Sequence, residues 1–504
     1  MKAKVFILSI IILRLLQGES TSAQEYRYTN TLFQGYTKTT GIVYGTAPFL
    51  NAPYINESAT TTQNLVLDLY QPLGDTLSHR PLIIFAHSGG FMTGSRTVND
   101  MVALCDTFAR KGYVTATIDY RQGLEIADNA DLHYTRAAYR GLQDGRTAVR
   151  YLKSKATQYG IDPDHVYFGG SSAGAFICLN AIYMDTNELP TYLGQVNYTA
   201  FLVQYSGPGL GKPDIGPNLE FSGTPGGVMG CWGGVGDTLT INTNNPTPVF
   251  LVHGTADQTV PFNSGPPFGY GGLSDVFGSH AISIRLTGIG IPAKETYFVT
   301  GQGHEFWGTS NGNWSNGTGG NAYWDTIVRK ATTFFWDLHK PEAGFNATIN
   351  GMEVDFTDQS QGSTAWKWEF GDGATATIQN PVHVYGQTGT YHVRQTVRNA
   401  IQSWDTINHS IVVSGSTALS EPDLPTVNIY PIPASEILTI DIDHGLKPDD
   451  FEVSDVFGRI MEKKSNLCNV TTRLDLTGWS NGIYFIRIHF GDRFVNRKLV
   501  VKHF

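Results

Sequence analysis

Three side chains that could together form a nucleophilic relay follow one another along the chain in the order Ser172, Asp257, His304. A serine hydroxyl is a poor nucleophile until a base removes its proton, and histidine is the usual base. A carboxylate then holds the imidazole in the correct tautomer. These residue types in this order therefore predict acyl-transfer chemistry, with Ser172 as nucleophile, Asp257 as orienting acid and His304 as base.

Ser172 is the centre of a Gly-x-Ser-x-Gly pattern over residues 170–174. A bare match is weak evidence in a chain with 56 glycines. The context is stronger, because a run of strand length, His165–Gly169, leads into the pattern and a helical pattern, Ala173–Met184, leads out of it. Glycines at the flanking positions allow the tight turn that lifts the serine above the sheet edge. Ser171 is the rival hydroxyl, but it occupies the position before the nucleophile.

Asp257 and His304 each follow a run of strand length. Pro248–Val252 precedes the turn that carries Asp257, and Thr296–Val299 precedes the glycine-rich segment that carries His304. In open α/β sheets, functional side chains gather outside the carboxyl ends of the strands. Both side chains are therefore expected to reach the serine, although Asp257 could instead stabilise its own turn.

Two other histidines compete with His304 for the role of base. His253 lies directly before the acid-bearing turn and is expected to be structural. His280 lies in a helix-like stretch without the glycine-rich exposure of His304. We therefore expect neither to accept the serine proton.

Backbone donors for an oxyanion are expected where the run Pro81–Ala86 ends in His-Ser-Gly-Gly-Phe. This matches the His-Gly-Gly-Gly type of oxyanion loop, with Ser88 in place of the first glycine. The N–H groups of Gly89 and Gly90, together with that of Ala173, are expected to bind the anionic oxygen of a tetrahedral intermediate. The alternative is an ordinary tight turn.

The segments around these residues alternate between strand and helix patterns. This alternation predicts a mostly parallel sheet covered on both faces, which would position the reactive side chains. The expected strands are Leu65–Tyr70, Pro81–Ala86, Val114–Tyr120, Val166–Gly169, Phe201–Tyr205, Pro248–Val252 and Thr296–Val299, and the expected helices are Asp100–Lys111, Tyr134–Tyr159, Ala173–Met184 and Ala322–Leu338. Gly207–Asn245 interrupts the alternation and is expected to form a lid or a wall of the substrate site. Trp232 and Trp307 are candidate pocket residues, with core packing as the alternative.

The remaining sequence predicts export and a modular architecture. Lys2 and Lys4, a short apolar run and small residues before Gln24 predict a cleavable signal peptide over residues 1–23. No later stretch is apolar enough to span a membrane. After Pro341 short alternating runs predict all-β modules over residues 341–414 and 427–504, joined by a polar linker, 415–426.

Charge and cysteine content exclude some classes of function. The net charge is −9 and no basic block is present, which argues against a nucleic-acid partner. The four cysteines match no zinc pattern. Cys105 and Cys178 fall in expected core helices and are predicted to be buried thiols, with disulfide pairing left open.

From about Leu65 to Lys340 these motifs resemble an α/β-hydrolase of the carboxylesterase and lipase type. The resemblance is carried by residues 80–91, 118–121 and 169–175. It implies an α/β-hydrolase domain over residues 24–340 that cleaves carboxylic esters without a metal or cofactor. Members of this family act on acetyl, feruloyl, acyl and polyester substrates.

The two all-β modules resemble known families as well. Residues 341–414 resemble a PKD domain, an immunoglobulin-like sandwich, through the run Trp-Lys-Trp-Glu-Phe-Gly-Asp-Gly that ends at Gly373. Such domains serve as spacers or bind insoluble polymers. Residues 427–504 resemble the C-terminal sorting domain of the type IX secretion system, with Ile432 where the family has asparagine. This implies passage through the periplasm to the outer cell surface or the medium of a Bacteroidota-like bacterium, with that secretion machinery as a partner.

The sequence therefore predicts an exported serine ester hydrolase that works through an acyl-enzyme, with polymer-linked esters such as decorated polysaccharide or polyester as expected substrates. Two alternatives stay open. An exported peptidase of the prolyl-oligopeptidase type shares the fold and the residue order, although such enzymes usually carry a propeller or long β domain before the hydrolase. A non-catalytic surface adhesin that uses the PKD domain is the other.

Overall fold

A computed structural model describes most of the chain. The described residues are 26–51, 59–125, 130–185, 198–200, 203–205, 209–308, 319–414, 426–442, 447–465, 471–491 and 493–503. The predicted signal peptide and all but the last residue of the predicted linker lie outside them. Within these ranges, no helix combines the length and the apolar character needed to cross a membrane.

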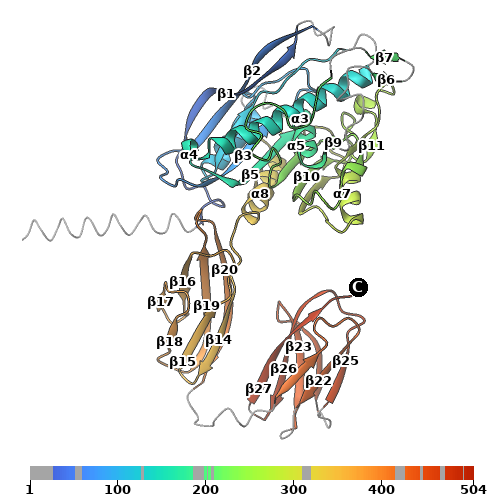
Figure 1. The fold of residues 1–504 in the computed structure, drawn as a ribbon. Coiled ribbons are helices and arrows are strands. Elements are labelled where there is room, and N and C mark those ends of the chain that lie inside the picture. Colours follow the sequence, from blue (N-terminus) through green and yellow to red (C-terminus); the bar gives the residue numbers. More distant parts are fainter. Residues whose placement is uncertain are drawn as a thin grey trace, which may run out of the picture. The chain divides into compact units, whose positions relative to one another are not determined.

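An eight-stranded sheet forms the centre of the first part of the chain (Figure 1). In spatial order its strands are β1 (Tyr36–Leu50), β2 (Thr60–Pro72), β4 (Val114–Ile118), β3 (Arg80–Ala86), β5 (Ile161–Ser171), β8 (Val228–Cys231), β10 (Val249–Gly254) and β13 (Glu295–Val299). The pairs β1–β2 and β2–β4 are antiparallel, and every pair from β4 to β13 is parallel. Strands β3, β4, β8 and β10 are buried throughout, as parallel strands covered on both faces must be. The predicted mostly parallel α/β sheet is confirmed.

Helices cover both faces of this sheet. They are α2 (Asn99–Ala109), α3 (Ala130–Ser154), α4 (Ala156–Tyr159), α5 (Ala173–Tyr183), α7 (Ser279–Gly288) and α8 (Ala322–Asp337). One apolar core joins the sheet to α3, α5 and α7, and a second joins it to α2 and α8. In α3, Ala148, Val149 and Leu152 lie on one face at helical spacing and are fully buried. The two cores hold the carboxyl ends of the strands, and the loops that follow them, in fixed positions.

The segment predicted to be an insertion differs from expectation. Gly207–Asn245 contributes β8 to the centre of the sheet, between β5 and β10. The run predicted to be that strand, Phe201–Tyr205, contributes β7 (Val203–Tyr205) to a two-stranded hairpin with β6 (Tyr198–Ala200). The prediction of which segment supplies this central strand is wrong, because β8 is only four residues long and lies among glycines. Its burial comes from neighbouring strands rather than from a long apolar run of its own.

Residues 209–227 of the same segment are tied to α3. Arg146 and Arg150 of that helix both pair with Asp214, the former at 2.8 Å. Gln143 donates two further hydrogen bonds to backbone carbonyls of the segment, at 2.7 and 2.8 Å. With several charged and polar bonds to one helix, this part of the predicted lid is a fixed structural element.

Three of the four cysteines lie in the described residues, and all three are buried free thiols. Burial raises the pKa of the Cys105, Cys178 and Cys231 thiols, which keeps them uncharged. The prediction of buried thiols is confirmed for Cys105 and Cys178. Cys468 lies outside the described residues.

Each all-β module consists of two antiparallel sheets, as predicted. The first module contains β14 (Phe345–Asn350), β15 (Glu353–Asp358) and β18 (Val382–Val384) in one sheet, and β17 (Thr375–Ala376), β16 (Ala365–Glu369), β19 (Gly389–Arg398) and β20 (Trp404–Val413) in the other. The second contains β21 (Val427–Tyr430), β22 (Ile437–Ile442) and β25 (Thr471–Asp475), and then β24 (Ile460–Ser465), β23 (Asp450–Asp455), β26 (Gly482–Phe490) and β27 (Arg493–Val501). Trp368 is buried inside the first all-β module, and Leu438, Ile486 and Leu499 are buried inside the second all-β module.

Candidate active site

Ser172 lies in the turn between β5 and α5 with φ of 53°, a left-handed conformation that non-glycine residues rarely adopt. Its N–H donates to the carbonyl of Cys231 at 3.0 Å, which fixes the turn against β8. A Cβ at Gly170 would lie 2.2 Å from the backbone of Gly174. A Cβ at Gly174 would lie 2.1 Å from the carbonyl oxygen of Ala86. The two glycines of the motif are therefore required by close backbone packing.

The structure brings Ser172, His304 and Asp257 together from three separate loops. His304 Nε2 lies 2.9 Å from Ser172 Oγ, and His304 Nδ1 lies 2.7 Å from Asp257 Oδ2. The other carboxylate oxygen of Asp257 accepts the backbone N–H groups of Thr259 at 2.8 Å and Val260 at 2.9 Å. In the tautomer that satisfies both imidazole contacts, Nδ1–H donates to the carboxylate and Nε2 is free to accept the serine proton.

The Asp257 carboxyl is held in its charged form. Burial by itself would raise its pKa, but hydrogen bonds from His253 and His304 outweigh burial and lower the pKa well below its ordinary value. The side chain is fully buried, so its charge acts on the imidazole with little screening by water. A negative charge therefore faces the ring on the side away from the serine.

The two rival histidines are occupied elsewhere. His253 is fully buried, and its Nε2 lies 3.0 Å from the Val260 carbonyl and 3.2 Å from Asp257 Oδ2. Its Nδ1 lies 2.8 Å from Ser279 Oγ. His280 bonds to Asn263 at 3.2 Å. These contacts give His253 the structural position expected for it, at the base of the acid-bearing turn.

The three proposed oxyanion donors lie on two loops beside Ser172. Gly89 and Gly90 have φ of 121° and 60°, and a Cβ at Gly89 would lie 2.1 Å from the Thr93 carbonyl oxygen. Gly90 and Ala173 line the same cavity as Ser172, whereas Gly89 does not line it. The positive φ angles of Gly89 and Gly90 give their N–H groups a different direction from those of an extended strand.

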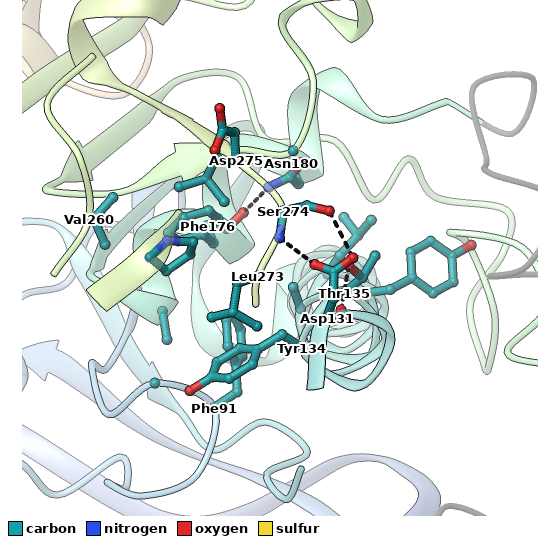
Figure 2. A pocket seen from close by; sticks show the side chains of 18 of the residues that line it. Phe91, Asp131, Tyr134, Thr135, Phe176, Asn180, Val260, Leu273, Ser274 and Asp275 are labelled. Carbon is teal, nitrogen blue, oxygen red and sulfur yellow. Dashed lines mark hydrogen bonds between the residues drawn. The ribbon is translucent and has the colours of Figure 1, made fainter. Parts of the chain in front are cut away.

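A cavity of about 350 Å³ opens beside Ser172 (Figure 2). Ligand sites in proteins start at about this size. Its walls come from α3, α5, the loop after β3 and the segments 236–240 and 259–276, so part of the predicted insertion does form a wall. Its apolar lining includes Phe91, Tyr134, Ala138, Leu142, Phe176, Val260, Phe268 and Leu273. Three acids, Asp131, Asp237 and Asp275, are also among the lining residues. The N–H and the hydroxyl of Ser274 donate to Asp131 at 2.6 and 2.8 Å, which ties one wall to α3.

The interpretation of Trp232 and Trp307 as pocket residues is wrong. Both are fully buried and neither lines the cavity. Their rings pack edge to face with centroids 4.7 Å apart, and Trp307 packs in the same way on Trp324. A tryptophan buries more apolar surface than any other residue, and here the second core supplies that burial.

Sequence reasoning also missed the residues that do form the cavity wall. Tyr134, Ala138 and Leu142 lie at successive positions four apart along α3, inside a helix that the sequence did predict. Their spacing is a usable signal of one helix face. That spacing is the same for a face that packs on a sheet and for a face that borders a cavity, so only the fold separates the two.

Family comparisons agree with this architecture. Residues 67–204 match the BD-FAE family model, residues 340–413 match the PKD domain, and residues 428–502 match the secretion system C-terminal sorting domain. The predicted resemblances to an esterase-type α/β-hydrolase, a PKD domain and a sorting domain are confirmed.

Curated relatives match parts of the chain. Neuroligin-like protein glit-1 of Caenorhabditis elegans is 31% identical over 138 residues, which are 26% of this chain and 17% of that protein. Carboxylesterase 3B of Mus musculus is 32% identical over 115 residues, 22% of this chain and 19% of its own length. Collagenase ColA of Bacillus cereus is 36% identical over 76 residues, 15% of this chain and 8% of its own length. The chain thus spans less than a fifth of the length of each of these relatives.

Among solved structures, Thermogutta terrifontis esterase 2 with bound propionate aligns at 19% identity over 55% of this chain and 90% of that chain, with a TM-score of 0.37. The sheet order and the three family matches together identify the domains of the chain. It carries a BD-FAE α/β-hydrolase domain, a PKD domain and a secretion system C-terminal sorting domain, and the last of these indicates a secreted or cell-surface protein.

Proposed function

We propose that the protein is a serine carboxylic-ester hydrolase that acts outside the cell through an acyl-enzyme. The observation that supports this most strongly is the relay from Asp257 through His304 to Ser172, with the serine hydroxyl beside a cavity large enough for a small acyl or aryl group. The three groups lie within 2.7 to 2.9 Å of one another along the relay, which is the reach that proton transfer needs.

The proposed reaction has two halves. His304 accepts the Ser172 proton as Ser172 Oγ attacks the ester carbonyl, and the N–H groups of Gly89, Gly90 and Ala173 bind the oxyanion that forms. The alcohol leaves with a proton from His304. Water then attacks the acyl-enzyme with His304 again as base, and the acid is released. Throughout, the Asp257 carboxylate stabilises the imidazolium and keeps its orientation.

The proposed substrates are esters on large external molecules, namely acetyl or feruloyl groups on polysaccharide, or polyesters. The sorting domain supports an external substrate, because an exported enzyme meets polymers that cannot enter the cell. The apolar walls of the cavity favour an uncharged group beside Ser172. The acids Asp131, Asp237 and Asp275 would repel a carboxylate there. We propose the type IX secretion machinery as the export partner.

Replacement of the nucleophile tests the proposal. We expect Ser172→Ala to lower kcat for p-nitrophenyl acetate by about 10⁴-fold or more, because the acyl-enzyme can no longer form. A fluorophosphonate probe should label the wild-type chain and not this variant. Ser78→Ala is the matched control, since Ser78 is exposed. It precedes the start of β3, whereas Ser172 follows the end of the parallel neighbour β5, so the two serines lie at opposite ends of the strands. Substantial turnover by Ser172→Ala would sink the assignment.

Two further assays separate the alternatives. Cleavage of amino-acyl anilides but not esters would favour a peptidase. A folded wild-type chain that resists the fluorophosphonate probe would favour a surface adhesin. A screen of acetylated xylan, feruloyl esters, polyesters and short acyl esters then identifies the substrate, and activity on long-chain triglycerides alone would contradict the polymer-ester proposal.

A further inference from the structure

Glu305, the residue after His304, is a buried carboxylate that the proposed mechanism does not use. Only 8% of it is exposed, and its backbone has φ of 50°. A left-handed conformation is unfavourable for a side chain with a Cβ, so the surrounding contacts must hold it there. The unusual backbone directs the His304 and Glu305 side chains to two different surroundings, the serine hydroxyl for one and the protein interior for the other.

The contacts of Glu305 join the loops that carry the proposed chemistry. The Ser171 hydroxyl donates to Glu305 Oε1 at 3.4 Å, and the indole N–H of Trp232 donates to Ser171 Oγ at 2.9 Å. Ser171 precedes the nucleophile. The Glu305 carboxylate therefore touches the nucleophile loop, and it belongs to the histidine loop.

The burial of Ser171 explains why it needs this partner. Its side chain is fully buried, so its hydroxyl needs an acceptor inside the protein. Glu305 supplies that acceptor.

The charge on Glu305 is set by its neighbours. Burial raises the pKa of its carboxyl above the ordinary value, and the charge of His304 and the Ser171 hydrogen bond offset only part of that rise. The other titratable groups that act on it or feel it are Asp257, Asp100 of α2, and Tyr120 after β4. Burial and the charge of Glu305 raise the pKa of Asp100 to about 7. Because only Glu305 has the imidazole beside it, the negative charge of this pair resides on Glu305.

We propose that Glu305 is a positioning residue, which ties the nucleophile loop to the loop of His304 and places a second carboxylate beside the imidazole. This rests on the proposed function. In the reaction, Glu305 would stabilise the imidazolium that forms when His304 takes the serine proton. It would also hold the turn at Ser172 against the loop of His304 through Ser171.

The test compares Glu305→Gln with Glu220→Gln, an exposed control on the segment that is tied to α3. Glutamine keeps the size of the side chain and removes its charge. We expect Glu305→Gln to lower kcat for p-nitrophenyl acetate by about 10- to 100-fold, since small misplacements of reacting groups have effects of that order. KM should change by less than about threefold, because the substrate cavity is intact. Glu220→Gln should match the wild-type chain in both constants.

A pH profile supplies the readout that a merely structural role would not move. A carboxylate beside the imidazole favours its protonated form, so removal of that charge lets the free base persist to lower pH. The acid limb of the kcat/KM profile should therefore move toward lower pH in Glu305→Gln. A drop in kcat with an unmoved acid limb and a lower unfolding temperature would overturn the proposal in favour of simple structural support.

Ser171→Ala keeps the proposal testable if Glu305→Gln fails to fold. It removes the hydroxyl that bonds to Glu305 and should lower kcat with little change in KM. Combined with Glu305→Gln, it should add almost nothing to the loss already seen, because the shared contact is gone. Fully additive losses, or a Glu305→Gln enzyme as fast as the wild-type chain, would overturn the proposal. A wild-type chain that neither hydrolyses esters nor reacts with the fluorophosphonate probe would instead remove the proposed function itself.

Discussion

Ser172 lies between two unlike regions of the same domain. On one side is the cavity, with an apolar lining from α3, α5 and the segment 259–276. On the other side is a buried polar cluster, in which Glu305, Ser171 and Trp232 are linked by hydrogen bonds and Asp100 lies within the influence of the Glu305 charge. The cavity can hold part of a substrate and has a largely apolar lining. The polar cluster is filled by protein side chains that hydrogen-bond to one another.

This difference separates two properties of an enzyme. Groups that touch only one part of a substrate change which substrate reacts, because they act on binding of that part. Groups that hold the reacting atoms change the rate for every substrate. We therefore expect substitutions in the cavity to alter selectivity, and substitutions in the relay or behind it to alter rate or stability without altering selectivity.

The largest effect is expected at Asp257. Asp257→Asn keeps the shape of the side chain but removes the charge that orients His304, and the amide can present its N–H₂ group to the ring. We expect kcat to fall by about 10⁴-fold, as when the same role is removed in other serine hydrolases. The loss should be equal for acetyl and aryl esters, and unequal losses would show that Asp257 also takes part in substrate selection.

Ala138→Phe should give the opposite pattern. The larger side chain projects from α3 into the cavity, where Ala138 is half-buried beside Phe176 and Leu142. We expect kcat/KM for a bulky aryl ester to fall by about 10-fold or more, with a much smaller change for an acetyl ester. Thermal unfolding measured in parallel should change little. Equal losses for both esters would mean that this cavity does not hold the variable part of the substrate.

A pH-dependent stability effect is expected at Asp100. Because its pKa is raised to about 7, the unfolded chain ionises first as pH rises, and the folded chain loses stability from about pH 4 up to about pH 7. Asp100→Asn lacks this loss, so it should be more stable than the wild-type chain by at least about 1 kcal/mol at pH 7.5, with a smaller gain at pH 4.5. Denaturant unfolding at the two pH values measures this, and a gain independent of pH would contradict the buried-acid explanation.

The smallest effect on substrate selectivity is expected at Trp307. Trp307→Phe shortens a fully buried ring and leaves a partly filled space between Trp232 and Trp324. We expect a loss of about 1 to 2 kcal/mol in the free energy of unfolding. The ratio of kcat/KM for aryl and acetyl esters should be unchanged. A shift in that ratio would return Trp307 to the substrate site from which its burial excludes it.

Much of the fold could be predicted from local patterns. The strands that lead into Ser172 and Asp257 contain apolar runs that end in glycine, and the strand that leads into His304 precedes a glycine-rich segment. The helices α3 and α8 are long and periodic. Strand β8 could not be found in this way, because four residues among glycines give no pattern of their own. Its neighbours in the sheet, β5 and β10, supply the hydrogen bonds and the burial that make it a strand.

The sequence by itself determined the modular order of the chain and the identity of Ser172, Asp257 and His304 as the groups that come together, because motif and order constrain them strongly. Only the tertiary structure decided what lies on either side of Ser172. Trp232 and Trp307 became core because the second apolar core surrounds them. The face of α3 at Tyr134, Ala138 and Leu142 became a cavity wall because, in the described part of the chain, the space beside it is left open. Ser171 and Glu305 lie far apart in the sequence with no shared pattern, and they meet because two strand ends of one parallel sheet deliver their loops to the same edge.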